Sequence, residues 1–146
     1  MAITQAIANA FKKQLLEGDA NFKSSGGDVF KLALYTSSAT LNSATTSFTT
    51  TNEVGNSGTY ASGGGTLTGQ NTSIASGVAI VDFADLSFTG VTLTARGALI
   101  YNTSSAVTNA AVAVLDFGAD KTATSGTFTI QFPAFTTAAA ILRISG

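Results

Sequence analysis

The side chains that carry out most enzyme chemistry are missing from this sequence. It contains no histidine and no cysteine, so the commonest general base, the thiol nucleophile and the imidazole and thiolate metal ligands are absent. Eight carboxylates and many Ser and Thr hydroxyls remain. We therefore expect a protein that is not an enzyme, with no catalytic residue, no metal site and no cofactor.

Two groups of aspartates are the remaining candidates for a chemical site. Asp82 and Asp85 lie in one turn and could supply part of a calcium site, although ordinary turn residues are the commoner explanation. Asp116 and Asp120, followed by Lys121, could form a paired-carboxylate site. Such catalysis needs two carboxyl groups that face each other across a cleft, and the sequence gives no sign of one.

One charged side chain stands out by its position. Arg96 lies within Val91–Tyr101, which alternates apolar and polar residues before Gly97 and is wholly apolar after it. A charge beside so apolar a run needs a partner or a route to water. We hypothesise that Arg96 pairs with Glu53 and so clamps the polar segment 36–70 to this strand. An arginine that is solvated or that contacts another subunit is the alternative.

The elements that would position these residues are mostly strands. Strands do not alternate with helices along the chain, so we predict a mainly β fold, an antiparallel β-sandwich of about seven strands with jelly-roll or immunoglobulin-like topology. A closed barrel is the alternative. The expected strands are 30–35, 78–83, a short strand near 88, 91–101, 111–117, 127–132 and 139–144.

The first 23 residues predict one amphipathic helix, because apolar residues recur at every fourth position. Gly18 is a natural stop for it, and Thr4 is a possible N-cap. The apolar face would pack either on the chain's own sheet or on another subunit, and its proposed interface residues are Ile3, Ile7, Phe11 and Leu15. We thus expect a helix or arm at 1–23 and a β-sandwich domain at 24–146.

The segment 36–70 is rich in Ser, Thr, Gly and Asn and has few apolar residues. So long a weakly structured segment is unusual inside a domain. Either short strands are hidden in it, or it is an extended arm that becomes ordered on another molecule.

The charge and hydropathy of the chain exclude several classes of partner. The net charge is −1, and Lys12 and Lys13 are the only adjacent basic residues, so we expect no nucleic-acid binding. No apolar run approaches the roughly 20 residues of a membrane helix, and the amino terminus does not resemble a secretion signal. Only 10% of the residues are charged, and such a surface is easily desolvated against neighbouring subunits.

Five short motifs follow one another in a distinctive order along the chain. They are Glu53-Val54, Ser57-Gly58-Thr59-Tyr60, TARGALIYN at Thr94–Asn102, AVLDFG at Ala113–Gly118 and GTFTIQFPA at Gly126–Ala134. In this order they resemble a group of small structural proteins of tailed bacteriophages, and the similarity covers roughly Val29–Ile144. One difference is that Gly55 and Asn56 follow the Glu-Val pair, where the group usually continues directly into Ser-Gly-Thr-Gly-Tyr.

The resemblance implies a virion protein that is assembled in the host cytoplasm. Among virion roles we expect a capsid decoration, or cement, protein that binds the major capsid protein and copies of itself and stabilises the outer shell. A tail, neck or fibre-base component is the alternative. A carbohydrate-binding sandwich is less consistent with the sequence, because it would need exposed aromatic residues and the chain has three tyrosines and no tryptophan.

Overall fold

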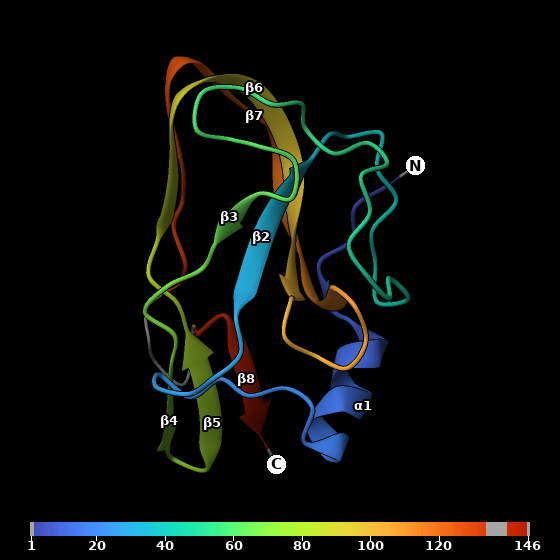
Figure 1. The fold of residues 1–146 in the computed structure, drawn as a ribbon, viewed down its shortest axis with the longest axis vertical. Helices are drawn as coiled ribbons and strands as arrows, with labels where there is room; N and C mark the ends of the chain where they lie inside the picture. The colour runs from blue at the N-terminus through green and yellow to red at the C-terminus, as the bar shows by residue number, and fades with distance from the viewer. Residues whose placement is uncertain (1, 134–139, 146) are drawn as a thin grey trace.

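The fold is built from antiparallel strands and one short helix, in a computed structural model that describes residues 2–133 and 140–145. This confirms the predicted mainly β fold with one helix near the amino terminus. Figure 1 labels the elements. In chain order they are β1 (Ala6–Ile7), α1 (Asn9–Glu17), β2 (Phe30–Tyr35), β3 (Gly65–Thr66), β4 (Asn71–Ala75), β5 (Val78–Asp82), β6 (Leu86–Asn102), β7 (Ala110–Ile130) and β8 (Leu142–Ser145).

The strands form two sheets. The larger has the order β1-β7-β6-β2-β3 and the smaller the order β4-β5-β8. β6 and β7 are 17 and 21 residues long and pair along nearly their whole length, with four register shifts. Such irregularities let a ribbon bend. In Figure 1 the ribbon rises on one side, turns over at the top and descends on the other, so one hairpin supplies two facing layers.

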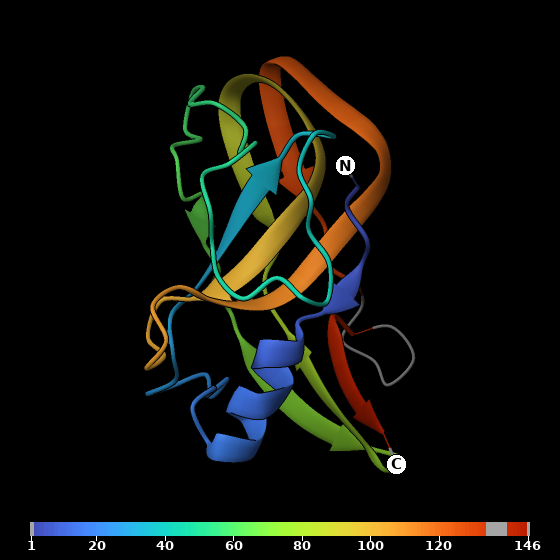
Figure 2. The ribbon, with the colours of Figure 1, turned by 90° about the vertical axis from the view of Figure 1, so that its right-hand side faces the viewer.

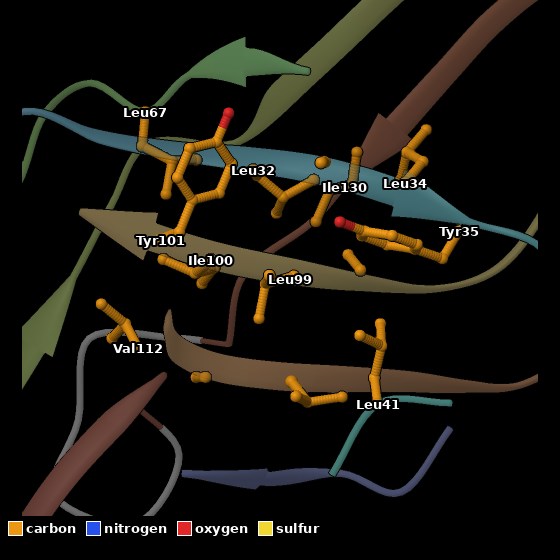
Figure 3. Close-up of a cluster of buried hydrophobic side chains, with 14 of the residues drawn as sticks. Leu32, Leu34, Tyr35, Leu41, Leu67, Leu99, Ile100, Tyr101, Val112 and Ile130 are labelled. Carbon is orange, nitrogen blue, oxygen red and sulfur yellow. The ribbon is translucent and has the colours of Figure 1, made fainter. Parts of the chain in front are cut away.

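The stretch Val91–Tyr101 lies in β6, as expected. Its alternating apolar residues and the run Ala98–Tyr101 are all buried, whereas Thr92 and Thr94 are exposed. Figure 3 shows Leu99, Ile100 and Tyr101 among the packed side chains of β2 and β7. The half-covered first part and the fully covered second part of this strand therefore follow the sequence pattern.

Two pairs of predicted strands are in fact single strands. The short strand near residue 88 and 91–101 are both parts of β6, and 111–117 is joined to the first part of 127–132 within β7, which ends at Ile130. The residues between the latter two are mostly exposed, so they show no apolar alternation. They nevertheless continue the ladder, with pairs such as Leu93 with Ala123 and Thr94 with Thr122.

The segment 36–70 is ordered against the rest of the same chain. It contributes β3 to the larger sheet, and isolated bridges join Leu41 to Ile3 and Glu53 to Tyr35. Its apolar residues Leu41, Val54, Tyr60 and Leu67 are buried. This agrees with the first of the two alternatives, short strands hidden in the segment, which here are one two-residue strand and isolated bridges.

The predicted helix over 1–23 is wrong in its extent. The helix covers only Asn9–Glu17, and β1 before it is an extended strand paired with β7. Thr4 is not the N-cap, because Ala8 holds that position. The predicted stop is confirmed, since Gly18 ends the helix in the left-handed conformation with φ 74°.

The physical reason is that Ile3 packs beside the strands rather than on a helix. Gly97 has no side chain, and a Cβ there would lie 2.9 Å from Ile3. The small residue therefore makes room for the isoleucine on the sheet. Since β1 and α1 share the hydrophobic core with β2, β6 and β7, residues 2–23 are not a separate arm.

The smaller sheet lies at the end of the molecule opposite the bend of the ribbon, and α1 lies beside it (Figures 1 and 2). β4 is absent from the predicted strands, because all of its residues are exposed and lack apolar alternation. β8 begins at Leu142, three residues later than expected, and Ala139 lies outside the described residues.

Substitutions at two glycines separate the cost of a left-handed backbone from the cost of a steric clash. Gly64 has φ +79° and a Cβ there would clash with the backbone of Leu32, whereas Gly118 has φ +80° with no atom within 4 Å. We expect Gly118→Ala to lower the free energy of unfolding by about 1–2 kcal/mol, the cost of a left-handed alanine. Gly64→Ala should cost clearly more in urea unfolding, and equal losses would contradict the close approach of this loop to β2.

Candidate functional site

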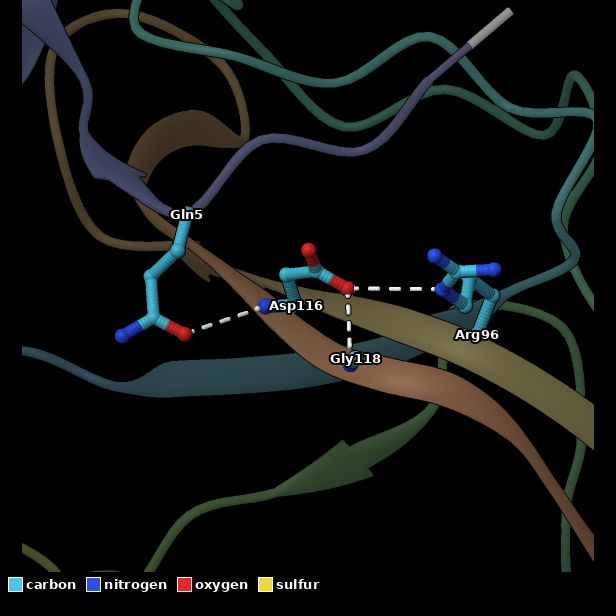
Figure 4. A network of polar contacts seen from close by, with 4 residues as sticks. All are labelled: Gln5, Arg96, Asp116 and Gly118. Carbon is cyan, nitrogen blue, oxygen red and sulfur yellow. Dashed lines mark hydrogen bonds and ion pairs between the residues drawn. The ribbon is translucent and has the colours of Figure 1, made fainter.

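Arg96 does not pair with Glu53, so this sequence-based hypothesis is wrong. Its Nε lies 3.5 Å from Oδ1 of Asp116, and both side chains are partly exposed, at 37% and 29%. The same carboxylate oxygen accepts a hydrogen bond from the backbone N–H of Gly118 at 2.9 Å. Figure 4 shows this group, with Gln5 accepting from the Asp116 N–H. The β6–β7 register brings the two charges together, because Gly97 is paired with Asp116.

Glu53 is instead the centre of a local hydrogen-bond network. Its Oε1 accepts from the hydroxyl of Tyr60 at 2.8 Å and from the N–H of Gly63 at 2.7 Å, and its Oε2 accepts from Ser62 at 2.8 Å. The Tyr60 hydroxyl in turn accepts from the buried N–H of Leu34, at 2.8 Å. Glu53 therefore holds its own segment against β2, through Tyr60 rather than through Arg96.

All three tyrosines anchor the segment 36–70 to the larger sheet. Tyr101 on β6 donates to the carbonyl oxygen of Gly63 at 2.6 Å, and Tyr35 on β2 donates to that of Thr49 at 2.6 Å. Burial raises the pKa of the Tyr101 hydroxyl from 10.0 to about 12. Burial also raises the pKa of Tyr35 and Tyr60 above the ordinary value. These groups are neutral structural hydrogen-bond donors at physiological pH.

The aspartates considered as a chemical site have different surroundings. The Oδ1 of Asp85 accepts from the N–H of Phe132 at 2.9 Å, and the Oδ1 of Asp82 is buried with no hydrogen-bond partner among the described residues. Asp120 is exposed. Within 2–133 and 140–145, no three Asp or Glu residues gather in an arrangement that could hold a metal ion.

The most distinctive surface feature is an apolar groove of about 640 Å³ between α1 and the smaller sheet. Two isoleucines at its border, Ile74 on β4 and Ile144 on β8, are 78% and 60% exposed. Clustered exposed apolar side chains typically mark an interaction surface. The groove is lined by Ile7, Phe11, Lys12, Leu15, Phe22, Thr72, Ser73, Ile74, Ala79, Ile80, Val81, Leu142, Arg143 and Ile144, with no acidic residue among them.

The four proposed interface residues divide into two pairs. Ile3 and Phe11 are nearly fully buried in the chain's own core, although Phe11 also lines the groove. Ile7 and Leu15 are only half-buried and line the groove. The exposed isoleucines Ile74 and Ile144 were not among the predicted interface residues. In sequence, Ile74 is the one large apolar residue of a Ser, Thr and Asn stretch, which is the signal that could have drawn notice.

Comparisons with protein-family models, curated proteins and solved structures found no match to this chain. Over the described residues, no helix is long and apolar enough to cross a membrane.

The hydrogen-bond network around Glu53 predicts which pairs of substitutions have coupled effects on the free energy of unfolding. Removing the Tyr60 hydroxyl leaves the buried N–H of Leu34 without its acceptor, so Tyr60→Phe should cost about 1–3 kcal/mol of unfolding free energy. In double-mutant cycles, Glu53→Ala and Tyr60→Phe should be strongly non-additive, whereas Glu53→Ala and Arg96→Ala should add to within about 0.5 kcal/mol.

Arg96→Ala with Asp116→Ala is the matched control, because partly exposed pairs are worth at most about 1 kcal/mol. A coupling between Glu53 and Arg96 larger than that between Glu53 and Tyr60 would contradict this assignment.

The raised pKa values of the tyrosines predict how the stability of the fold depends on pH. Their folded pKa values lie above the unfolded value of 10.0, so their contribution is fully present below pH 10. For Tyr101 it is lost as the pH rises through about 12. The chain has no tryptophan, so near-ultraviolet absorbance reports phenolate formation cleanly.

The native protein should show almost no phenolate at pH 10, and the same protein in urea should be half-ionised there. A native tyrosine that titrates at pH 10 would show that at least one hydroxyl is not buried.

Proposed function

We propose that this protein is a structural component of a bacteriophage virion, and specifically a capsid decoration protein that binds and stabilises the outer shell. Two observations support this. The motifs of β6 and β7 resemble those of small phage structural proteins, and the apolar groove concentrates exposed isoleucines at one end of the molecule. The groove is the observation that carries the proposal, because it gives a ready-made attachment surface.

The chemistry of the groove defines the segment that it would bind. Its walls are apolar, and its charged lining residues, Lys12 and Arg143, are both basic. Lys12 has only a long hydrogen bond, 3.4 Å, to Asn9 within the described part of the chain. The complementary partner is an apolar segment of the major capsid protein that also carries a carboxylate. The apolar contact supplies affinity, and the charge pair sets orientation.

The rest of the fold suits a protein that is held by many such contacts. A single standard interface buries about 800 Å² on each partner, and repeated sites multiply a modest affinity. The chain itself is anchored by buried hydrogen bonds at Tyr35, Tyr60 and Tyr101, so binding does not have to order the segment 36–70. We propose that copies assemble on the shell in the host cytoplasm.

The groove can be tested by adding purified protein to particles that lack it. Ile144→Asp places a charge in the apolar groove, and Lys12→Glu reverses the charge at its border, so each should weaken binding by at least about tenfold. Val107→Asp and Lys121→Glu are the matched controls, because Val107 is 52% exposed, Lys121 is exposed, and neither lines the groove.

The number of copies per particle, measured by quantitative mass spectrometry of purified virions, tests where in the virion the protein is located. Hundreds of copies per particle are expected for a shell protein, whereas about three to twelve copies would indicate the tail, neck or a vertex. Absence from the particle would contradict a virion role altogether. If the control variants lose binding as strongly as the groove variants, then the protein binds through another surface.

A further inference from the structure

Within residues 2–133 and 140–145, β4 is an open sheet edge without the features that usually block such edges. It lies at the end of the order β4-β5-β8, and among the described residues no backbone hydrogen bond joins it to a strand other than β5. Its sequence, Asn-Thr-Ser-Ile-Ala, has no charge and no proline, and its five pairs with β5 run without a bulge. Lysine, proline and bulges are the devices that prevent edges from pairing.

The hairpin turn fixes which backbone groups of β4 face outward. Ser76 and Gly77 connect β4 to β5 with φ values of 51° and 76°, as in a two-residue type I′ turn. Ala75 and Val78 then form the hydrogen-bonded pair next to the turn, and pairs alternate from there. The N–H and C=O groups of Ile74 and Thr72 therefore point away from β5.

One side-chain contact agrees with this assignment of the free edge. The N–H of Thr72 donates to the side-chain oxygen of its neighbour Asn71 at 2.9 Å, which is a local substitute for a missing strand. The open edge is also continuous with the apolar groove, because Thr72, Ser73 and Ile74 line it.

We propose that β4 pairs with β4 of a second copy of this chain, antiparallel, about a two-fold axis at Ser73. In this register Ser73 faces its own counterpart, and Thr72 faces Ile74 of the other copy. Both outward residues then lie in hydrogen-bonded pairs, which gives four backbone hydrogen bonds across the axis. Asn71 would release the Thr72 N–H to the new partner. The two small sheets become one sheet of six strands.

The uncharged edge explains why the partner is another copy. No like charges meet when two β4 strands approach, whereas the opposite edge of the sheet, β8, carries Arg143. The two-fold axis keeps both grooves on the same face of the joined sheet, so each exposed Ile74 gains the Thr72 methyl group as a neighbour. A pair of five-residue strands buries less than the roughly 800 Å² per partner of a stable interface, so pairing should be weak in dilute solution and strengthened by co-assembly.

Cysteine cross-linking tests the register directly, and the test does not depend on the proposed virion function. The chain has no cysteine, so Ser73→Cys supplies its single thiol. The two Ser73 residues would form a non-hydrogen-bonded pair with Cα atoms about 4.5 Å apart, within the range of a disulfide. Ser145→Cys is the matched control, because Ser145 is an exposed serine on the opposite edge of the same sheet.

We expect the Ser73→Cys protein to form disulfide-linked dimers at least about tenfold faster than the Ser145→Cys protein under mild oxidation, because pairing raises the effective thiol concentration. Equal rates would overturn the proposal, whether β4 is then free or pairs with another protein.

A second variant separates strand pairing from random collision. Proline at position 74 removes an N–H that faces away from β5, so Ile74→Pro should leave the β4–β5 hairpin intact. In the Ser73→Cys background it should reduce dimer formation to the rate of the Ser145→Cys control, with unchanged circular dichroism. If the double variant cross-links as fast as Ser73→Cys alone, edge pairing is not the cause.

Discussion

The order of the polar segment 36–70 depends on the hydrogen bonds that the carboxylate of Glu53 accepts. This carboxylate accepts three hydrogen bonds from residues within ten positions of it, and one of these donors, Tyr60, also accepts from the backbone of β2. A carboxylate so near a core would be costly without donors, and each donor would be costly without the carboxylate. The network is therefore stabilising only as a complete set.

This constraint determines which surfaces are left for partners. Because the segment 36–70 is held on the larger sheet, it covers Tyr101 of β6, and the ring of Phe48 in the segment stacks on that tyrosine with the ring centroids 4.8 Å apart. The apolar surface that stays uncovered lies at the other end, around α1 and the smaller sheet. The two proposed contacts, the groove with the shell and the β4 edge with another copy, are compatible, since side chains of β4 line the groove and its backbone forms the edge.

Local patterns predicted the strands whose burial is carried by their own residues. Apolar residues alternate along β2 at Phe30, Leu32 and Leu34, and this pattern predicts the strand with its bounds. The apolar run of β6 is predicted for the same reason. The sequence pattern does not predict β4, because this strand is exposed on both faces. The spacing of Ile3 and Ile7 is typical of a helix, but pairing with neighbouring strands determines the conformation of both residues.

In the candidate site, too, some contacts join residues that are near in the sequence and others join residues that are far apart. The partners of Glu53 lie nearby in the sequence, yet they depend on a turn at Gly63 and Gly64 that has positive φ values of 96° and 79°. The partner of Arg96 is Asp116, which is brought to it by the register of β6 and β7. The groove combines α1 with β4, β5 and β8, and no short window of sequence contains it.

We infer that the segment 36–70 is folded onto the larger sheet before the protein meets any partner, so that the α1 and β4-β5-β8 end is the surface left for a partner. Hydrogen exchange of the free protein tests it most directly. Amides that are bonded inside the segment, such as those of Val54 and Gly63, should exchange as slowly as that of Leu34 in β2. Exchange of the Val54 and Gly63 amides at the rate of an unfolded chain would show that the segment is not folded in the free protein.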